Sequence, residues 1–130
     1  MSVVVGYVPA PEGRAALDRG IAEARLRQTG LVVVNTSRGD ALVDQRYLQG
    51  DALEQLRVEL AGLDVPAELR QVDAGHDVAE LLEVVAQESD AQLVVIGLRR
   101  RSRVGKLILG SAASRILLTV GCPVLTVKAS

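Results

Sequence analysis

The sequence is poor in aromatic residues: it has no Trp, no Phe and only two tyrosines, Tyr7 and Tyr47. Proteins that bind single-stranded nucleic acid stack its bases on aromatic side chains. The net charge of −1 also differs from the strongly basic balance of most nucleic-acid-binding domains. A nucleic-acid partner is therefore the least favoured interpretation of this chain.

Cysteine and histidine each occur once, as Cys122 and His76. A single cysteine excludes an internal disulfide framework and is typical of a reducing cytoplasm; we expect Cys122 to be a small buried apolar residue. A metal site would need further His or Cys ligands at suitable spacing, and the sequence offers no pairing of a nucleophile with a base. We therefore expect no catalytic residues and no protein metal site.

Long hydrophobic runs are absent as well. Hydrophobic residues make up 48% of the chain, yet no run reaches the roughly 18–20 residues of a membrane-spanning helix. Short parallel strands buried on both faces explain this richness. The first residues enter an apolar run without a charged region or a cleavage pattern, so no secretory signal is expected. We expect one cytoplasmic domain of 130 residues with no membrane partner.

Acidic residues are missing from the last forty positions. Residues 91–130 carry seven basic residues, whereas the first ninety hold all 16 acidic residues and eight arginines. Five of the seven lie between Arg99 and Lys106, after an apolar run and before a helical pattern. A basic, glycine-containing turn from a strand to a helix is where an α/β protein would hold a phosphate. On charge alone, a solvated basic loop is an equally good interpretation.

The pair Gly105-Lys106 suggests a P-loop, but the pattern fails at two positions. Arg100 occupies the position of the first required glycine, and Leu107 replaces the Ser or Thr that would hold magnesium. The sequence therefore argues against Walker-type chemistry.

Short apolar runs alternate with helical patterns along the whole chain. The runs cover residues 3–7, 31–34, 67–72, 93–96 and 124–127, and the third is more polar, as expected of an edge strand. Gly30 and Gly62 stand where helix C-caps are expected, and Asp77 is a good N-cap. The expected apolar helix faces are Leu17/Gly20/Ile21/Ala24, Leu53/Leu56/Leu60/Leu63, Val78/Leu81/Leu82/Val85 and Ile108/Ala112/Ile116/Val120. This alternation predicts an α/β fold, doubly wound around a parallel sheet, in which ligands bind beyond the carboxyl ends of the strands.

Three segments together resemble the universal stress protein family: the run ending at Gly97, the pair Gly110-Ser111, and residues 122–127. Nucleotide-binding members of this family carry Gly-x2-Gly-x9-Gly-Ser/Thr between the fourth strand and the fourth helix. Here the pattern reads Gly97-x2-Arg100-x9-Gly110-Ser111, so three of its four positions match at the right spacing. The resemblance covers the whole chain.

This resemblance implies one adenine nucleotide alpha hydrolase-like domain with a five-stranded parallel sheet in the order 3-2-1-4-5. It also implies an adenine nucleotide, ATP foremost and magnesium with it, between the ends of strands one and four. Two departures stand out: Arg100 replaces the second glycine, and Val8 stands where nucleotide-binding relatives have an aspartate. The planar guanidinium of Arg100 can donate hydrogen bonds to a phosphate, which would compensate for a phosphate that can no longer come close to the backbone of a glycine. The expected site comprises Val8, Val34 and Ile96 at the ribose and base, with Gly97, Arg100, Arg103, Lys106, Gly110 and Ser111 at the phosphates.

The leading interpretation is a small regulatory protein of the stress response that binds an adenine nucleotide. It is not expected to be an enzyme, although weak hydrolysis of the nucleotide stays open. The alternative is a nucleotide-free dimeric module whose basic loop contacts an acidic partner protein. In either case an unprotected apolar edge strand needs covering, and the resemblance implies a homodimer through the last strand, at Val124, Leu125, Thr126 and Val127.

Overall fold

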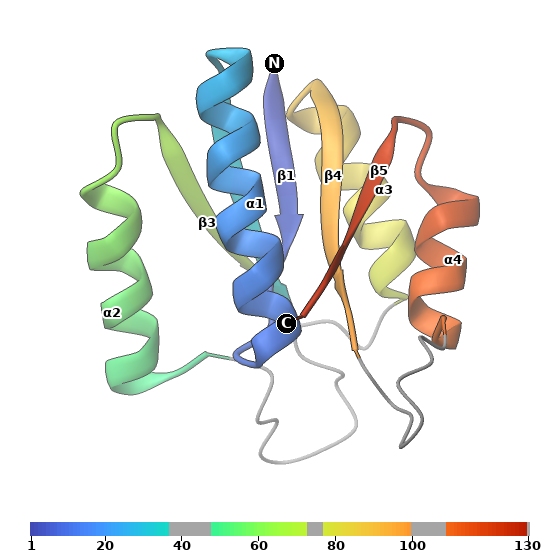
Figure 1. Cartoon of the computed structure of the whole chain (residues 1–130), viewed down its shortest axis with the longest axis horizontal. Helices are drawn as coiled ribbons and strands as arrows, with labels where there is room; N and C mark the ends of the chain where they lie inside the picture. Colours follow the sequence, from blue (N-terminus) through green and yellow to red (C-terminus); the bar gives the residue numbers. More distant parts are fainter. Residues whose placement is uncertain (37–47, 73–76, 100–108, 130) are drawn as a thin grey trace.

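A computed structural model describes residues 1–36, 48–72, 77–99 and 109–129. Strands and helices alternate along the chain, and Figure 1 shows them in their spatial arrangement. Their bounds are β1 (Ser2–Gly6), α1 (Pro11–Arg27), β2 (Gly30–Thr36), α2 (Gly50–Ala61), β3 (Ala67–Val72), α3 (Val78–Glu88), β4 (Ala91–Leu98), α4 (Ser111–Thr119) and β5 (Val124–Lys128).

The five strands form one parallel sheet in the order β3-β2-β1-β4-β5, which confirms the predicted fold class and strand order. All strands end at the same edge of the sheet, the lower edge in Figure 1. β1 lies at the centre, and Val3, Val4 and Val5 are each 0% exposed. The more polar β3 is an edge strand, as its sequence predicted. Because the chain runs outward from β1 in both directions, β1 and β4 lie side by side where the order switches.

Each face of the sheet is covered by two helices. One core cluster joins α1 and α2 to the side chains of Val3, Val5, Val33 and Val95, and the other joins α3 and α4 to the opposite face. The alternating side chains of the central strands thus enter two different cores, because successive residues of a strand point to opposite faces. The side chain of Asp77 accepts a hydrogen bond from the Ala79 N–H and caps α3, as predicted.

Two details of the helices differ from the predictions. Gln28, and not Gly30, takes the left-handed conformation that ends α1, and its N–H bonds the carbonyls of Ala24 and Arg25. The turn is therefore complete before Gly30, which opens β2. On α4, Ile116 and Val120 are buried but Ala112 is exposed, because the side chain at this position borders a pocket at the start of the helix. Ile108 lies outside the described residues.

Asn35, at the end of β2, is a buried polar residue that ties three strands together. It is 0% exposed. Its side-chain amide donates to the Tyr7 carbonyl at 3.1 Å and its Oδ1 accepts from the Leu48 N–H at 2.9 Å and from Gln71 at 3.2 Å. A buried amide with these partners fixes the relative positions of the carboxyl ends of β1, β2 and β3.

Candidate functional site

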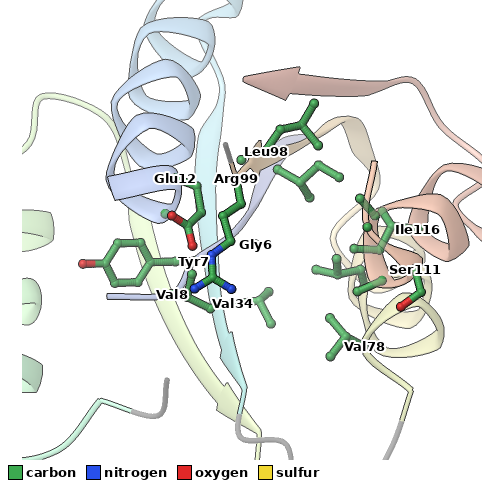
Figure 2. A pocket seen from close by; sticks show the side chains of 17 residues that line it. Gly6, Tyr7, Val8, Glu12, Val34, Val78, Leu98, Arg99, Ser111 and Ile116 are labelled. Carbon is green, nitrogen blue, oxygen red and sulfur yellow. The ribbon is translucent and has the colours of Figure 1, made fainter. Parts of the chain in front are cut away.

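A pocket opens at the carboxyl ends of β1 and β4, between the first turns of α1 and α4 (Figure 2). Its volume is about 260 Å³. β2 and α3 complete its walls through Val34, Val78 and Leu82. The pocket therefore lies at the point where the strand order switches, which is where parallel α/β sheets bind ligands.

The structure brings six of the nine predicted nucleotide-site residues into this pocket: Val8, Val34, Ile96, Gly97, Gly110 and Ser111. The other three, Arg100, Arg103 and Lys106, lie outside the described residues, as does His76. Val34 and Ile96 are nearly fully buried at 2% and 5% exposed, so their side chains form the apolar floor of the pocket.

The start of α4 forms one end of the pocket. The first backbone N–H groups of a helix have no partner within the helix and carry partial positive charge, so they favour an anion. Gly110 is the N-cap, with φ −69° and ψ 164°, a conformation that any residue can adopt. A Cβ built on Gly110 would have no described atom within 4 Å. Among the described residues, the missing side chain therefore leaves open space at the start of the helix, next to Ser111.

Gly97 has a different reason to lack a side chain. A Cβ at this position would lie 1.9 Å from the Glu12 carbonyl oxygen, which is far inside contact distance. A Cβ on Gly13 would likewise lie 1.7 Å from the Val8 carbonyl oxygen. Gly97 permits the first turn of α1 to pack directly against the end of β4, and Gly13 permits it to pack on Val8 in the connection that follows β1. The family resemblance assigns Gly97 to the phosphates, and the structure adds this packing requirement.

Two charged residues that were not among the predicted site residues line the pocket: Glu12 on α1 and Arg99 after β4. Figure 2 shows both on one side of the pocket, with Ser111, Val78 and Ile116 on the other. Arg99 belongs to the basic cluster recognised in the sequence. Pro11 and Glu12 are recognisable as a helix start, but nothing in the sequence indicates that this start packs against Gly97.

An ion pair between Asp77 and Arg115 joins α3 to α4 beside the pocket. The hydrogen bond from Arg115 lowers the pKa of the Asp77 carboxyl. Asp77 precedes Val78, and Arg115 lies one turn after Ser111, so this pair holds together the two helices that form the far wall. Because both side chains contact solvent, the ion pair contributes little to the free energy of unfolding, and its main effect is to position α3 and α4 relative to each other.

Two further titratable groups, Tyr7 and Cys122, do not direct their side chains into the pocket. The ring of Tyr7 points away from the pocket in Figure 2, and its burial raises the pKa of the phenol. Cys122, predicted to be a small buried apolar residue, is half-buried and packs against the core cluster between the sheet and helices α3 and α4; this burial raises the pKa of its thiol. Among the described residues, His, Cys, Asp and Glu form no group of three that could hold a metal ion. No helix in the described part of the chain is long and apolar enough to cross a bilayer.

Comparison with known proteins extends this picture. A universal stress protein from Mycolicibacterium smegmatis is 47% identical over 126 residues, which cover 97% of this chain and 96% of that protein. The structure of a universal stress protein from Archaeoglobus fulgidus has a TM-score of 0.76 and 28% identity, with 98% of each chain covered.

A second structure from Archaeoglobus fulgidus, described as a universal stress protein in complex with dAMP, has a TM-score of 0.67 and 22% identity, again with 98% of each chain covered. This likeness shows a shared fold. The model of the universal stress protein family matches residues 1–128. With this match over nearly the whole length, and with the parallel sheet in the order 3-2-1-4-5, the chain belongs to the universal stress protein family.

Proposed function

We propose that this protein binds an adenine nucleotide, ATP foremost, in the pocket between the ends of β1 and β4, and acts as a small cytoplasmic regulator of the stress response without catalytic chemistry of its own. One observation carries the proposal: the start of α4 faces an apolar pocket, and the space in front of it is left open by Gly110. Such a pocket offers an anion site and an apolar slot side by side.

Different residues of the pocket suit different parts of the nucleotide. The apolar slot at Val8, Val34 and Ile96 suits the base and one face of the ribose. The backbone N–H groups after Gly110 and the hydroxyl of Ser111 suit the phosphates, whose charge Arg100, Arg103 and Lys106 would neutralise. Magnesium would arrive with the nucleotide. The complex of the Archaeoglobus fulgidus relative with dAMP supports an adenine nucleotide as the ligand class.

Titration calorimetry of the purified protein with ATP, ADP, AMP and cyclic AMP tests this function. We expect ATP to bind with micromolar affinity, about −8 kcal/mol. The affinity should fall short of nanomolar because Val8 supplies no carboxylate to the adenosine. Absence of heat with all four nucleotides at millimolar concentration would contradict nucleotide binding. The family fold would then serve the alternative function, a dimeric module whose basic residues contact an acidic partner.

We further propose that the protein is a homodimer through β5. This strand is the edge of the sheet, and Val124, Leu125, Thr126 and Val127 are only partly covered. The Val94 N–H donates to the Pro123 carbonyl at 3.0 Å and the Ala129 N–H donates to the Leu98 carbonyl at 3.4 Å. Backbone groups of successive strand residues point to opposite sides, so those of Val124 and Thr126 face the open edge. A second copy of β5 could pair with them.

Thr126→Pro is expected to convert this dimer into a monomer. Proline removes an N–H that faces the open edge and leaves the hydrogen bonds to β4 intact, which is the arrangement in which a strand tolerates proline. Light scattering at micromolar concentration measures the change, with Thr126→Val as the control that keeps the N–H. A wild-type monomer, or a dimer that persists in Thr126→Pro, would contradict this interface.

A further inference from the structure

Glu12 is a pocket residue whose carboxylate forms no ion pair or hydrogen bond with the rest of the described chain. It is partly buried, in the first turn of α1. The carboxylates of Asp18, Glu59 and Asp77, by contrast, are each paired with an arginine. A carboxylate accepts hydrogen bonds, so one that faces this cavity without a partner among the described residues is free to accept from a ligand there.

The backbone of Glu12 is held rigidly. Its carbonyl lies so close to Gly97 that a Cβ there would approach to 1.9 Å, and the neighbouring Gly13 packs as closely on Val8. The first turn of α1 therefore has no room to shift toward β4 or toward Val8. A side chain that projects from such a turn presents its carboxylate from a fixed wall, which a selective contact requires.

The position of Glu12 relative to α4 restricts what it can bind. Figure 2 shows Glu12 and Ser111 on opposite sides of the pocket, and Arg99 on the same side as Glu12. A carboxylate repels phosphate, whereas the start of α4 attracts it. An uncharged sugar hydroxyl of the ligand is a donor that suits this position, and the nearby guanidinium of Arg99 would offset repulsion between Glu12 and the phosphates.

We infer that Glu12 accepts hydrogen bonds from the ribose hydroxyls of the bound nucleotide and makes this protein selective for ribonucleotides over deoxyribonucleotides. This inference rests on the proposed nucleotide binding. A site built to bond a hydroxyl discriminates strongly against an analogue that lacks it, because its buried polar group then stays unpaired. Glu12 would thereby replace part of the contact to the adenosine that is lost because Val8 stands in place of an aspartate.

Calorimetry with ATP, 2′-deoxy-ATP and 3′-deoxy-ATP tests the inference. The wild type should bind at least one deoxy analogue about tenfold more weakly than ATP, as expected for loss of a hydrogen bond to a charged group. In Glu12→Ala, ATP should weaken to the level of that analogue, so that the ratio of the two affinities falls to about one. Glu12→Gln, which keeps an acceptor oxygen, should retain part of the preference.

Asp51→Asn is the matched control. Asp51 also lies in the first turn of a helix, α2, but does not line this pocket, so its substitution removes a similar interaction with a helix start and leaves the ligand preference unchanged. Equal preference for ATP in the wild type and Glu12→Ala, or no preference in the wild type, would overturn the role of Glu12 while nucleotide binding stood. Failure of all three nucleotides to bind the wild type would overturn both.

Discussion

Gly110→Val is expected to weaken nucleotide binding strongly and leave the fold intact. The backbone of Gly110 is in an extended conformation open to all residues, and a Cβ there meets no described atom within 4 Å. The described part of the protein therefore accommodates valine, but its side chain would fill the space beside the start of α4 that we assign to the phosphates. Calorimetry with ATP should show at least a hundredfold loss of affinity, about 2.7 kcal/mol. Adding Ser111→Ala should complete the loss.

The size of the side chain provides the control for this prediction. Gly110→Ala adds only the Cβ, so its affinity should fall between those of the wild type and Gly110→Val. The thermal unfolding midpoints of all three proteins should agree closely. Unchanged ATP affinity in Gly110→Val would place the phosphates elsewhere, and a strongly lowered midpoint would mean that this glycine serves the fold.

Gly97→Ala is expected to have the opposite effect, a large loss of stability. Its Cβ would lie 1.9 Å from the Glu12 carbonyl oxygen and 2.5 Å from the carbonyl carbon, so the backbone of α1 would have to move away from β4. Overpacking against backbone that cannot yield typically costs about 1–3 kcal/mol, and we expect the upper end here because both partners are main chain. Urea unfolding monitored by circular dichroism measures the difference.

Gly6→Ala is the matched control for Gly97→Ala. Gly6 also ends a central strand and lines the pocket, but its added Cβ would meet the side chains of Ile96 and Leu82 at 3.4 and 3.7 Å, which are ordinary contacts. We expect it to cost less than about 1 kcal/mol. If Gly97→Ala proved as stable as Gly6→Ala, the close packing of α1 on β4 would be refuted.

Most of the fold could be predicted from the sequence because each strand appears there as a short apolar run. The Val-rich runs of β1, β2 and β4 are too short and too apolar for anything but buried parallel strands, and Asp77 marks the start of α3. The strand order came from family resemblance, since alternation of strands and helices is compatible with several orders. The end of α1 was misplaced because Gln28 adopted the left-handed conformation that glycine usually supplies.

The site was only partly predictable for a physical reason. The spacing from Gly97 to Gly110 and Ser111 identified the end of the pocket that lies on one continuous stretch of chain. Glu12 was missed because its position depends on how closely α1 packs on β4, and that approach follows from two missing side chains far apart in the sequence. Tertiary contacts of this kind leave no local pattern, whereas helix caps and buried strands do.

The amide of Asn35 has a consequence for how this protein can change over evolution. Its Oδ1 accepts a hydrogen bond from the Leu48 N–H, and its amide group donates one to the Tyr7 carbonyl, so both ends of the connection from β2 to α2 are fastened to the sheet. Lengthening a connection whose ends are already fixed costs little, roughly 0.6 kcal/mol for each doubling of its length. Residues 37–47 can therefore accept insertions and exchanges that the strands on either side would not survive.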